Sequence, residues 1–266
     1  MGILNVTPDS FADASHPRDA AEALDLALRM EADGADIIDV GGESTRPGAD
    51  AVPADEERRR VLPVVRALAA SVRIPISIDT YKATVAEAAL AEGAVIVNDV
   101  SGLRYEPALA GVVGTTGAAI VLMHNRGRSK TMYQHAAYHD VVGEVIAELA
   151  TSVLTATAAG VRRESIVIDP GIGFAKRAAD SYGVLARLPE FATGLDRPLL
   201  AGPSRKSFMR DALTDRPAVE RDWGTAAAVA AAVLAGAHIV RVHAVSAMAQ
   251  VVRVAEEIRQ ANRIIG

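Results

Sequence analysis

The 266-residue sequence contains no cysteine, which excludes disulfide bonds and thiolate metal sites. Basic residues are not in excess: the formal net charge is −5, so a broad electrostatic surface for nucleic acid is not expected. The most apolar stretch, 226–237, is shorter than the roughly 20 residues that span a bilayer. The start has no basic leader and is interrupted at Asn5, and Val6 stands where a myristoylation signal needs Ser or Thr. We therefore expect a cytoplasmic protein that binds neither nucleic acid nor a membrane.

Short runs of aliphatic residues occur eight times along the chain, and each ends at polar residues or a polar turn. These ends are, in chain order, Asn5, Asp39, Asp79, Asn98, His124, Asp169, 202–204 and Arg241. Segments long enough for helices separate the runs, and this alternation predicts βαβ units with a parallel sheet. Eight units close a parallel β/α (TIM) barrel, whose usual size matches this chain. We therefore predict an α/β fold with one domain, 1–266, an eight-stranded TIM barrel whose mouth gathers the polar residues.

Helical stretches are expected between the runs, and Gly followed by Ala or Val separates several of them from the next run. Gly just past a helix can adopt the left-handed conformation that terminates it. Pro63 lies inside the second stretch, so we expect a kink or a break there. The expected helices are 19–33, 54–70, 82–92, 106–115, 141–159, 181–188, 225–235 and 247–260.

Three of the run-ending residues, Asp79, Asn98 and Asp169, offer carboxylate and amide groups. In a recessed mouth such groups can hydrogen-bond a flat heterocycle that carries amino, ring N–H and carbonyl groups. Each could instead only cap the following helix, and Asp169 before Pro-Gly is also a turn signal. Three such residues together favour a binding pocket.

Two further segments, at the seventh and eighth runs, offer groups that bind anions. Arg241 and His243 alternate with a valine, so both project to the same side of the strand. Arg241 could stack on a ring and bind phosphate, or form an arginine–carboxylate bridge inside the barrel. Ser204, Lys206 and Ser207 follow the seventh run, where barrels often bind anions through free backbone N–H groups.

The most distinctive string is Gly-Gly-Glu-Ser-Thr-Arg-Pro-Gly at 41–48. Its glycines permit backbone conformations closed to other residues, and Thr45 and Arg46 can contact phosphate or carboxylate. The spacing of its residues matches neither nucleotide-binding glycine motif, which disfavours nucleotide folds. A flexible linker is the alternative, and the polar residues among the glycines argue against it.

Three histidines, His124, His135 and His139, lie in or near the segment after the fifth run and could suggest a metal site. No acidic residue accompanies them in a His-Glu-x-x-His arrangement, so a solvated loop is the preferred interpretation. Asn5 offers a neutral oxygen of the kind that Mg²⁺ accepts beside phosphate oxygens and water.

With these residues assembled, the chain strongly resembles the dihydropteroate synthases over essentially its full length. The resemblance is carried by eight stretches in the right order: 2–11, 39–48, 77–80, 98–100, 122–124, 169–174, 204–207 and 241–243. It implies a transferase of folate biosynthesis that joins para-aminobenzoate to dihydropterin-methyl pyrophosphate and releases pyrophosphate, with Mg²⁺ as cofactor. It further implies departure of the leaving group first, then attack by the arylamine, and a homodimer formed through the outer helices late in the chain.

The resemblance also assigns roles to residues. The pterin edge would be held by Asp79, Asn98, Asp169 and Lys206. The pterin faces would lie against Met123 and Arg241. The pyrophosphate and Mg²⁺ would be served by Asn5, Thr45, Arg46, Arg241 and His243. The aminobenzoate would be framed by Pro47, Phe174, Ser204, Lys206 and Ser207. The residues that act on the reacting groups would be Thr45, Arg46, Lys206 and Arg241.

The sequence departs from the family pattern in three places. The first loop, 12–17, lacks the usual pair of glycines, Ala244 stands where Asp commonly follows the histidine, and Asn125-Arg126 replaces Met-Gln. We expect these changes to affect loop closure and substrate affinity rather than the chemistry. Three alternatives remain: the pterin barrel of a methyltetrahydrofolate methyltransferase, a non-catalytic pterin-binding paralogue, and a plain phosphate-binding barrel enzyme.

Overall fold

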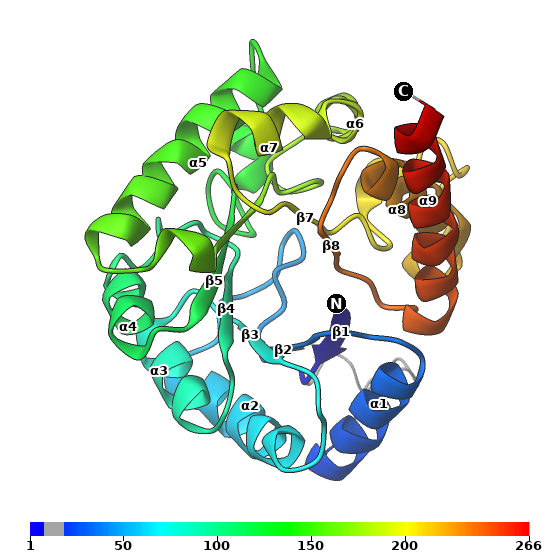
Figure 1. The fold of residues 1–266 in the computed structure, drawn as a ribbon. Coiled ribbons are helices and arrows are strands. Elements are labelled where there is room, and N and C mark those ends of the chain that lie inside the picture. The colour runs from blue at the N-terminus through cyan, green and yellow to red at the C-terminus, as the bar shows by residue number, and fades with distance from the viewer. Residues whose placement is uncertain (8–18, 266) are drawn as a thin grey trace.

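The computed structural model describes residues 1–7 and 19–265, and in this part of the chain parallel strands form a ring inside a layer of helices (Figure 1). The first loop, 12–17, therefore lies outside the described residues. The strands are β1 (Gly2–Asn5), β2 (Ile38–Gly41), β3 (Ile76–Asp79), β4 (Ile96–Asp99), β5 (Ala119–Met123), β6 (Ile166–Asp169), β7 (Leu200–Ala201) and β8 (Ile239–Val240). They are the eight strands that the sequence predicts.

The ring closes at two short seams. Strands β1 to β6 form one continuous parallel sheet, and β7 pairs with β8. Isolated parallel bridges join Gly2 to Val242 and Ile168 to Leu199, and so connect the two sheets on both sides. At the first seam the backbone N–H of Ile3 donates to the carbonyl of Val242 over 3.0 Å. The predicted TIM barrel is confirmed.

The helices are α1 (Ala20–Ala32), α2 (Ala54–Ala69), α3 (Ala83–Ala91), α4 (Ala108–Thr116), α5 (Val141–Ala158), α6 (Ala178–Ala186), α7 (Leu188–Leu195), α8 (Asp222–Leu234) and α9 (Val245–Ile265). Short 3₁₀ turns are η2 (Met132–His135), η3 (Arg163–Ser165), η4 (Ser207–Met209) and η5 (Ala218–Glu220). The glycines at 34, 93, 117, 160 and 236 all have positive φ, as expected of residues just past a helix.

One helix prediction is corrected, and a break considered at Pro63 does not occur. The single helix expected at 181–188 is two helices, α6 and α7, which meet at Arg187, with a proline in the first turn of α7. Helix α2 runs without a break through Pro63. The ring of Pro63 lies on the exposed face, where solvent can hydrogen-bond the carbonyl of Arg59 that has lost its helical donor.

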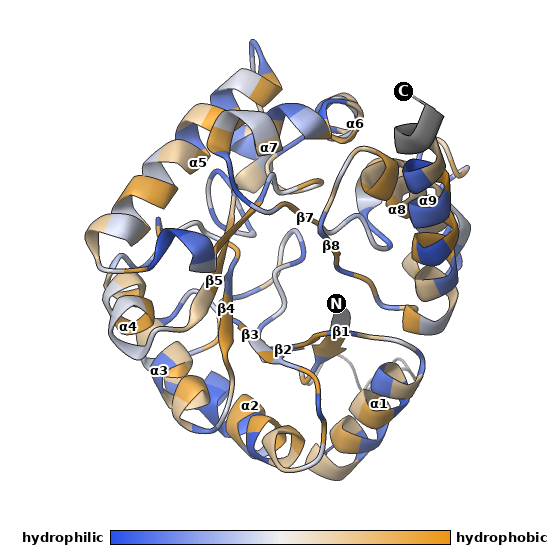
Figure 2. Cartoon of the chain, viewed as in Figure 1, coloured by the Kyte–Doolittle hydropathy of each residue, from blue (hydrophilic) through white to orange (hydrophobic). Residues whose placement is uncertain are grey.

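Apolar side chains fill both the space between strands and helices and the lower part of the barrel. The strands are mostly hydrophobic along their length, and the helices are striped (Figure 2). A cluster inside the ring closes the lumen at the end opposite the mouth; it consists of Met1, Ile37, Ile96, Val121, Val167, Leu200 and Ile239. The barrel is therefore a packed core and not a pore.

Helix α5 is long and apolar enough to cross a membrane by length and composition alone, a test that a core helix of a globular domain also passes. Its buried residues, among them Val145, Leu149 and Val153, pack in the main hydrophobic cluster of the barrel. This packing accounts for its apolar composition.

Candidate active site at the barrel mouth

The polar residues of the mouth stand directly above the apolar plug of the lumen. Side chains two residues apart on a strand point to the same face. Counting two residues on from the plug on each strand gives Asp39, Asn98, Met123, Asp169, Gly202 and Arg241. The sequence therefore places these groups in the lumen, one layer above the plug.

A cavity of about 570 Å³ opens at this mouth. Most of the predicted site residues line it: Asn5, Thr45, Arg46, Pro47, Asp79, Phe174, Ser204, Lys206, Ser207, Arg241 and His243. The remaining three, Asn98, Met123 and Asp169, are 3–4% exposed and lie beneath the lining. This concave space thus brings together the phosphate and aminobenzoate residues that the resemblance implies, with Asp79, Lys206 and Arg241 of the pterin set.

Arg241 forms the centre of the lumen network. Its Nε donates to Asp39 Oδ2 over 2.6 Å, and its Nη2 donates to Asp79 Oδ2 over 2.7 Å. Asn98 Nδ2 donates to the same oxygen of Asp39 over 2.9 Å. The arginine–carboxylate bridge weighed as an alternative is therefore present, although Arg241 also lines the cavity. Burial raises the pKa of Asp79 to about 7, against the opposing effect of Arg241.

Asp39 is a site residue that the sequence-based assignment left out. It is fully buried and accepts both of the hydrogen bonds just described. Its position in the sequence could have identified it, because Asp39 ends the second aliphatic run as Asp79 ends the third. Asp79 Oδ1 is buried and has no hydrogen-bond partner among the described residues, so a donor group on a ligand that entered the lumen could satisfy it.

Asp169 and Lys206 both lie beside Gly202. A Cβ placed on Gly202 would lie 3.8 Å from Lys206 Nζ, 3.8 Å from Arg241 Cβ and 4.0 Å from Asp169 Oδ2. Lys206 Nζ donates to the carbonyl of Ile172 over 2.5 Å. Burial raises the pKa of Asp169 and lowers that of Lys206 to about 8, while the attraction between the two opposes both shifts. The missing side chain at 202 leaves room among three groups able to hydrogen-bond or stack on a ligand.

The rim after β7 and β8 holds hydroxyl and cationic groups. Ser204 Oγ and His243 Nδ1 are 2.9 Å apart, and the backbone N–H of His243 donates to the same hydroxyl. Arg205 has a positive φ of 57° and donates twice to the carboxylate of Asp222, which fixes the turn ahead of Lys206. Lys206 Nζ also stands 4.4 Å from the centre of the Phe174 ring.

The loop 42–52 is anchored and is not a flexible linker. Glu43 accepts hydrogen bonds from Tyr81 Oη at 3.0 Å, Lys82 Nζ at 2.6 Å and the backbone N–H of Val52 at 2.9 Å. Lys82 also pairs with the buried carboxylate of Glu57. On the other side the backbone N–H of Gly48 donates to the carbonyl of residue 129. Thr45 and Arg46 are thus held at the mouth by residues that the sequence did not single out.

The histidine interpretation needs correction at one position. His124 is 1% exposed, so it does not belong to a solvated loop. Its Nε2 lies 3.1 Å from Glu148 Oε2 and its Nδ1 lies 2.9 Å from Lys176 Nζ. Across residues 1–7 and 19–265, no group of three or more His, Asp or Glu is arranged to hold a metal. Asn125 and Arg126 do not line the cavity; they bind Tyr105 and the glutamates of α5.

Comparison with known proteins agrees with this geometry. Residues 1–243 match the pterin binding enzyme family. Dihydropteroate synthase of Synechocystis sp. is 47% identical over 256 residues, 96% of this chain and 88% of that protein. The Bacillus subtilis enzyme is 45% identical over 253 residues, 95% of this chain and 86% of that protein.

Solved structures extend the comparison to three dimensions. Yersinia pestis dihydropteroate synthase in complex with a sulfonamide drug superposes with a TM-score of 0.93 at 39% identity, covering 98% of this chain and 94% of that one. Xanthomonas albilineans dihydropteroate synthase with 4-aminobenzoic acid gives a TM-score of 0.90 at 41% identity, covering 97% and 92%. The chain belongs to the dihydropteroate synthase family, transferases of folate biosynthesis.

Proposed function

We propose that this protein condenses para-aminobenzoate with (7,8-dihydropterin-6-yl)methyl diphosphate to give 7,8-dihydropteroate and pyrophosphate. The observation that supports this most is the shared cavity, in which a carboxylate floor lies under a rim of hydroxyl and cationic groups. Solved relatives hold 4-aminobenzoic acid in one case and 7,8-dihydropteroate in another. The methyltransferase alternative does not account for the anion-binding rim at 204–207 or the loop at 44–48.

In this proposal the pterin lies over the floor of the cavity. Asp79, Asn98, Asp169 and Lys206 hold its edge, and Met123 and Arg241 lie against its faces. The free oxygen of Asp79 fits this role, because a ring amino group or N–H would supply the donor that it lacks. Arg241, fixed by Asp39 and Asp79, presents a planar cation that need not reorganise when the ring binds.

The pyrophosphate would bind at the rim, to Thr45, Arg46, Arg241 and His243. Asn5 ends β1 at the cavity wall and offers one neutral oxygen. Such a donor fits Mg²⁺, which keeps several waters and takes one or two protein oxygens besides phosphate oxygens. When bound, Mg²⁺ would neutralise charge on the departing pyrophosphate.

The aminobenzoate would bind between Pro47 and Phe174, with its carboxylate at the start of η4. There the hydroxyl of Ser207 and the side chains of Ser204 and Lys206 supply donors. Lys206 therefore stands between the two substrates, close to the floor and to the Phe174 ring.

This arrangement suits a reaction in which charge separation is the barrier. An arylamine is already a nucleophile, so the protein has to favour departure of pyrophosphate. Arg46, Lys206 and Arg241 surround the departing group and the developing positive charge lies over the carboxylates of Asp79 and Asp169. Exclusion of water by the loop 42–52 would protect the methylene cation from hydrolysis before the amine attacks.

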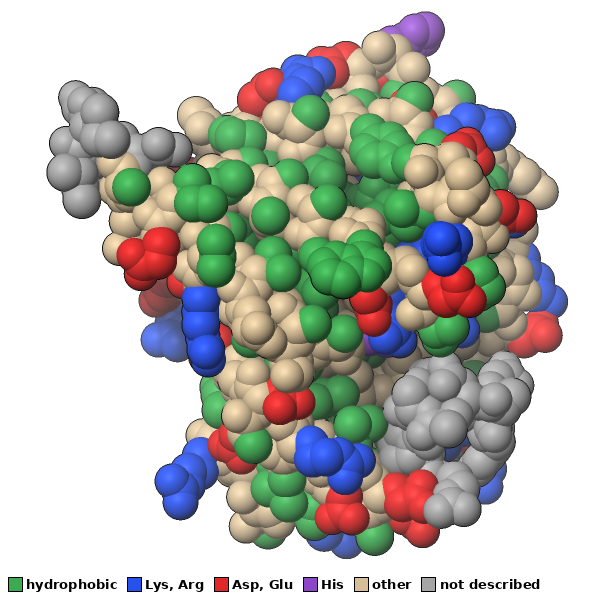
Figure 3. Space-filling model, turned by 90° about the vertical axis from the view of Figure 1, so that its right-hand side faces the viewer, with side chains coloured by type: hydrophobic (Ala, Val, Ile, Leu, Met, Phe, Trp, Pro, Cys, Tyr) green, Lys and Arg blue, Asp and Glu red, His purple; other side chains and the backbone are tan. Residues whose placement is uncertain are grey.

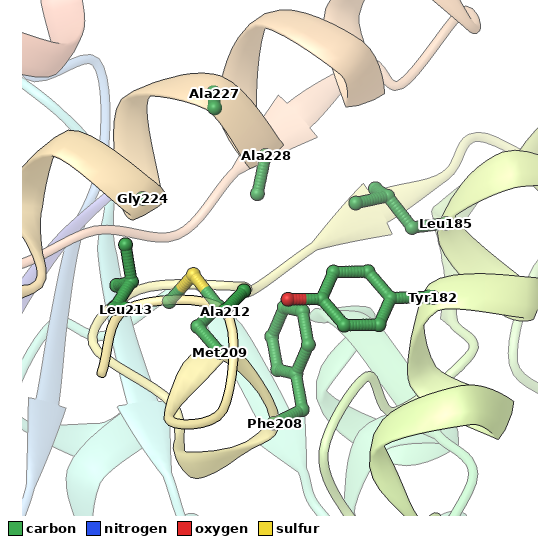
Figure 4. Close-up of a pocket in the computed structure, with 9 residues that line it drawn as sticks. All are labelled: Tyr182, Leu185, Phe208, Met209, Ala212, Leu213, Gly224, Ala227 and Ala228. Carbon is green, nitrogen blue, oxygen red and sulfur yellow. The ribbon is translucent and has the colours of Figure 1, made fainter. Parts of the chain in front are cut away.

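A homodimer is part of the proposal, formed by a second copy on the side of α6, α8 and η4. On the side where α8 and α9 face outward, hydrophobic side chains gather (Figure 3). Trp223, in the first turn of α8, is 87% exposed. Next to it an apolar hollow of about 290 Å³ lies between Tyr182, Phe208 and α8 (Figure 4). Light scattering at micromolar concentration tests this, and a monomer would reject it. The cytoplasmic location and the single domain 1–266 stay predictions.

The function is tested by pyrophosphate release. We expect release that requires both substrates and Mg²⁺, with formation of 7,8-dihydropteroate in equal amount. Binding of the pterin without turnover would instead identify a non-catalytic paralogue, and absence of pterin binding would leave only a phosphate-binding barrel. The variant Asp169→Asn replaces an acceptor oxygen by a donor and should weaken pterin binding at least about tenfold, since a charged hydrogen bond contributes about 1.5–3 kcal/mol.

A further inference from the structure

Lys176, which follows the loop after β6, has one of the largest fully buried side chains among the described residues. It lies outside the cavity lining and takes no part in the roles given above. Its Nζ lies 2.9 Å from His124 Nδ1, 3.2 Å from the carbonyl of Gly171 and 3.1 Å from the carbonyl of Phe174. Burying a charged group costs free energy unless hydrogen bonds compensate it, and these three partners supply that compensation.

The partners of Lys176 show which segments it holds. His124 follows the end of β5, directly after Met123. Gly171 and Phe174 bracket the turn after Asp169, whose Oδ1 accepts the backbone N–H of Gly171 over 2.7 Å. The carbonyl that Lys206 binds belongs to Ile172 in the same turn. One ammonium group therefore links the end of β5, through the His124 side chain, to the turn that follows Asp169 and carries Phe174.

Burial lowers the pKa of Lys176 to about 7, and the hydrogen bonds match the protonated form that exists below this pH. An ammonium has three N–H donors, and the three partners are two carbonyls and one imidazole nitrogen. The imidazole can accept from Lys176 if its other nitrogen, Nε2, carries the proton and donates to Glu148. Burial lowers the pKa of His124 to about 3, in agreement with this neutral form. The chain of contacts ends at the surface, where Glu148 pairs with Arg104 and Arg126.

We propose that Lys176 is a positioning residue for the transfer reaction: it fixes the turn 170–174 and places a positive charge behind Asp169, so that this carboxylate stays ionised under the pterin. The proposal rests on the proposed function, in which Asp169 holds the pterin edge. It assigns no contact between Lys176 and substrate. Its effect on the reaction passes through Asp169, Phe174 and the Ile172 carbonyl.

The electrostatic part of this role has a defined direction. The charged groups that act on Asp169 are Lys206 after β7, Lys176 after β6 and Arg241 directly after β8. Asp79 of β3 interacts with two of these groups, Arg241 and Lys206. All three cations lower the pKa of Asp169 against the effect of burial. Removing one cation raises that pKa, so Asp169 is protonated at a higher pH. Loss of the acceptor then weakens pterin binding at pH values where the wild type still binds.

The test uses two variants of the full-length protein. Lys176→Met removes charge and hydrogen bonds at similar volume, and Lys176→Gln keeps two N–H donors without the charge. We expect the acidic limb of kcat/KM for the dihydropterin diphosphate to move upward by about one pH unit or more in both variants. We also expect KM for para-aminobenzoate to rise more in Lys176→Met than in Lys176→Gln, because the Phe174 carbonyl keeps a donor only in the latter.

A matched control is Arg197→Met, which removes another largely buried cation, 11% exposed, before β7 at the opposite end of the barrel. It should lower the melting temperature without moving the pH profile. An unmoved acidic limb in both Lys176 variants would overturn the proposal, since a purely structural lysine would lower stability alone. Should Lys176→Met not fold, the limb of Lys176→Gln decides the question.

A second comparison separates this proposal from the proposed function. In the Asp169→Asn background the group that titrates is absent, so adding Lys176→Gln should no longer shift the limb. If Asp169→Asn alone leaves pterin binding unchanged, the assignment of Asp169 to the pterin fails first. If Asp169→Asn weakens binding but Lys176→Gln shifts nothing in the wild-type background, only the role of Lys176 fails.

Discussion

Gly202 offers a test of where the pterin lies that leaves the folded protein almost unchanged. A methyl group there would meet Lys206 Nζ, Arg241 Cβ and Asp169 Oδ2 at 3.8–4.0 Å, which is ordinary van der Waals contact. The φ of Gly202 is not positive, so alanine fits its backbone. The free energy of unfolding of Gly202→Ala should therefore rise by about 0.4–1 kcal/mol, through the lower entropy of the unfolded chain.

Bound pterin would have to share this space with the added methyl group. Forcing one extra methyl into a filled site costs about 1–3 kcal/mol, equivalent to a loss of affinity of roughly fivefold to a hundredfold. Calorimetric titration with the dihydropterin diphosphate measures this, and urea unfolding measures stability. Gly111→Ala is the matched control, because Gly111 lies in the interior of α4 with no atom within 4 Å of its added Cβ. It should gain up to about 1 kcal/mol of stability with unchanged kinetics. Unchanged pterin affinity in Gly202→Ala would refute the placement of the ring over this floor.

Three other changes probe the same site. Arg241→Ala leaves the carboxylates of Asp39 and Asp79 buried without their cation, so it should lower the free energy of unfolding by about 3–5 kcal/mol and also lower turnover. Lys206→Ala should abolish most turnover with little change in melting temperature. Equal stability of the two variants in urea would contradict the expectation that Arg241→Ala is the less stable. The pKa of Asp79 is raised to about 7, above its unfolded value, so its ionisation destabilises the fold as the pH rises from about 4 to 7. The stability of Asp79→Asn relative to wild type should therefore increase between pH 5 and 8, and a pH-independent difference would argue against this shift. Sulfonamides should compete with para-aminobenzoate, since the loop 44–48 carries no inserted residue that would clash with a close isostere; normal turnover in a large excess of drug would show that the site has a different shape.

The fold could be predicted from the sequence because the alternation of aliphatic runs and helical stretches, and the polar residues that end the runs, are local properties of the chain. Each aliphatic run ends where a strand reaches the mouth, and a barrel brings such ends together whatever the details of packing. The helix prediction failed at 181–188 because α6 and α7 are separated by one residue, Arg187, and no glycine or long polar segment marks the junction. A break at Pro63 does not occur, because burial of one face of α2 outweighs the loss of one hydrogen bond on the other.

The partners within the site could not be predicted in the same way. Arg241 is 202 residues from Asp39 and 162 from Asp79, so their pairing depends on which strands become neighbours across the lumen. Lys176 follows a glycine-rich turn, where a lysine is ordinarily exposed. Its burial results from the packing of this turn against the end of β5, a contact between segments about 50 residues apart. The residue types indicated which groups could bind substrate, but the hydrogen-bond partners of Arg241 and Lys176 depend on the tertiary structure.

The seam between β8 and β1 has a consequence for how the protein folds. It is held by bonds such as that from the Met1 amino group to the carbonyl of Val240, which joins residues 239 positions apart in the chain. Contacts of such separation carry a large loop-closure entropy and form slowly. Until β8 arrives, an incomplete ring exposes two unpaired strand edges that can associate with other chains. Arg241 directly follows β8 and bonds Asp39 of β2, so the charge network of the mouth also depends on closure of this seam. Substrate that binds only the closed ring would therefore draw late folding intermediates toward the native state.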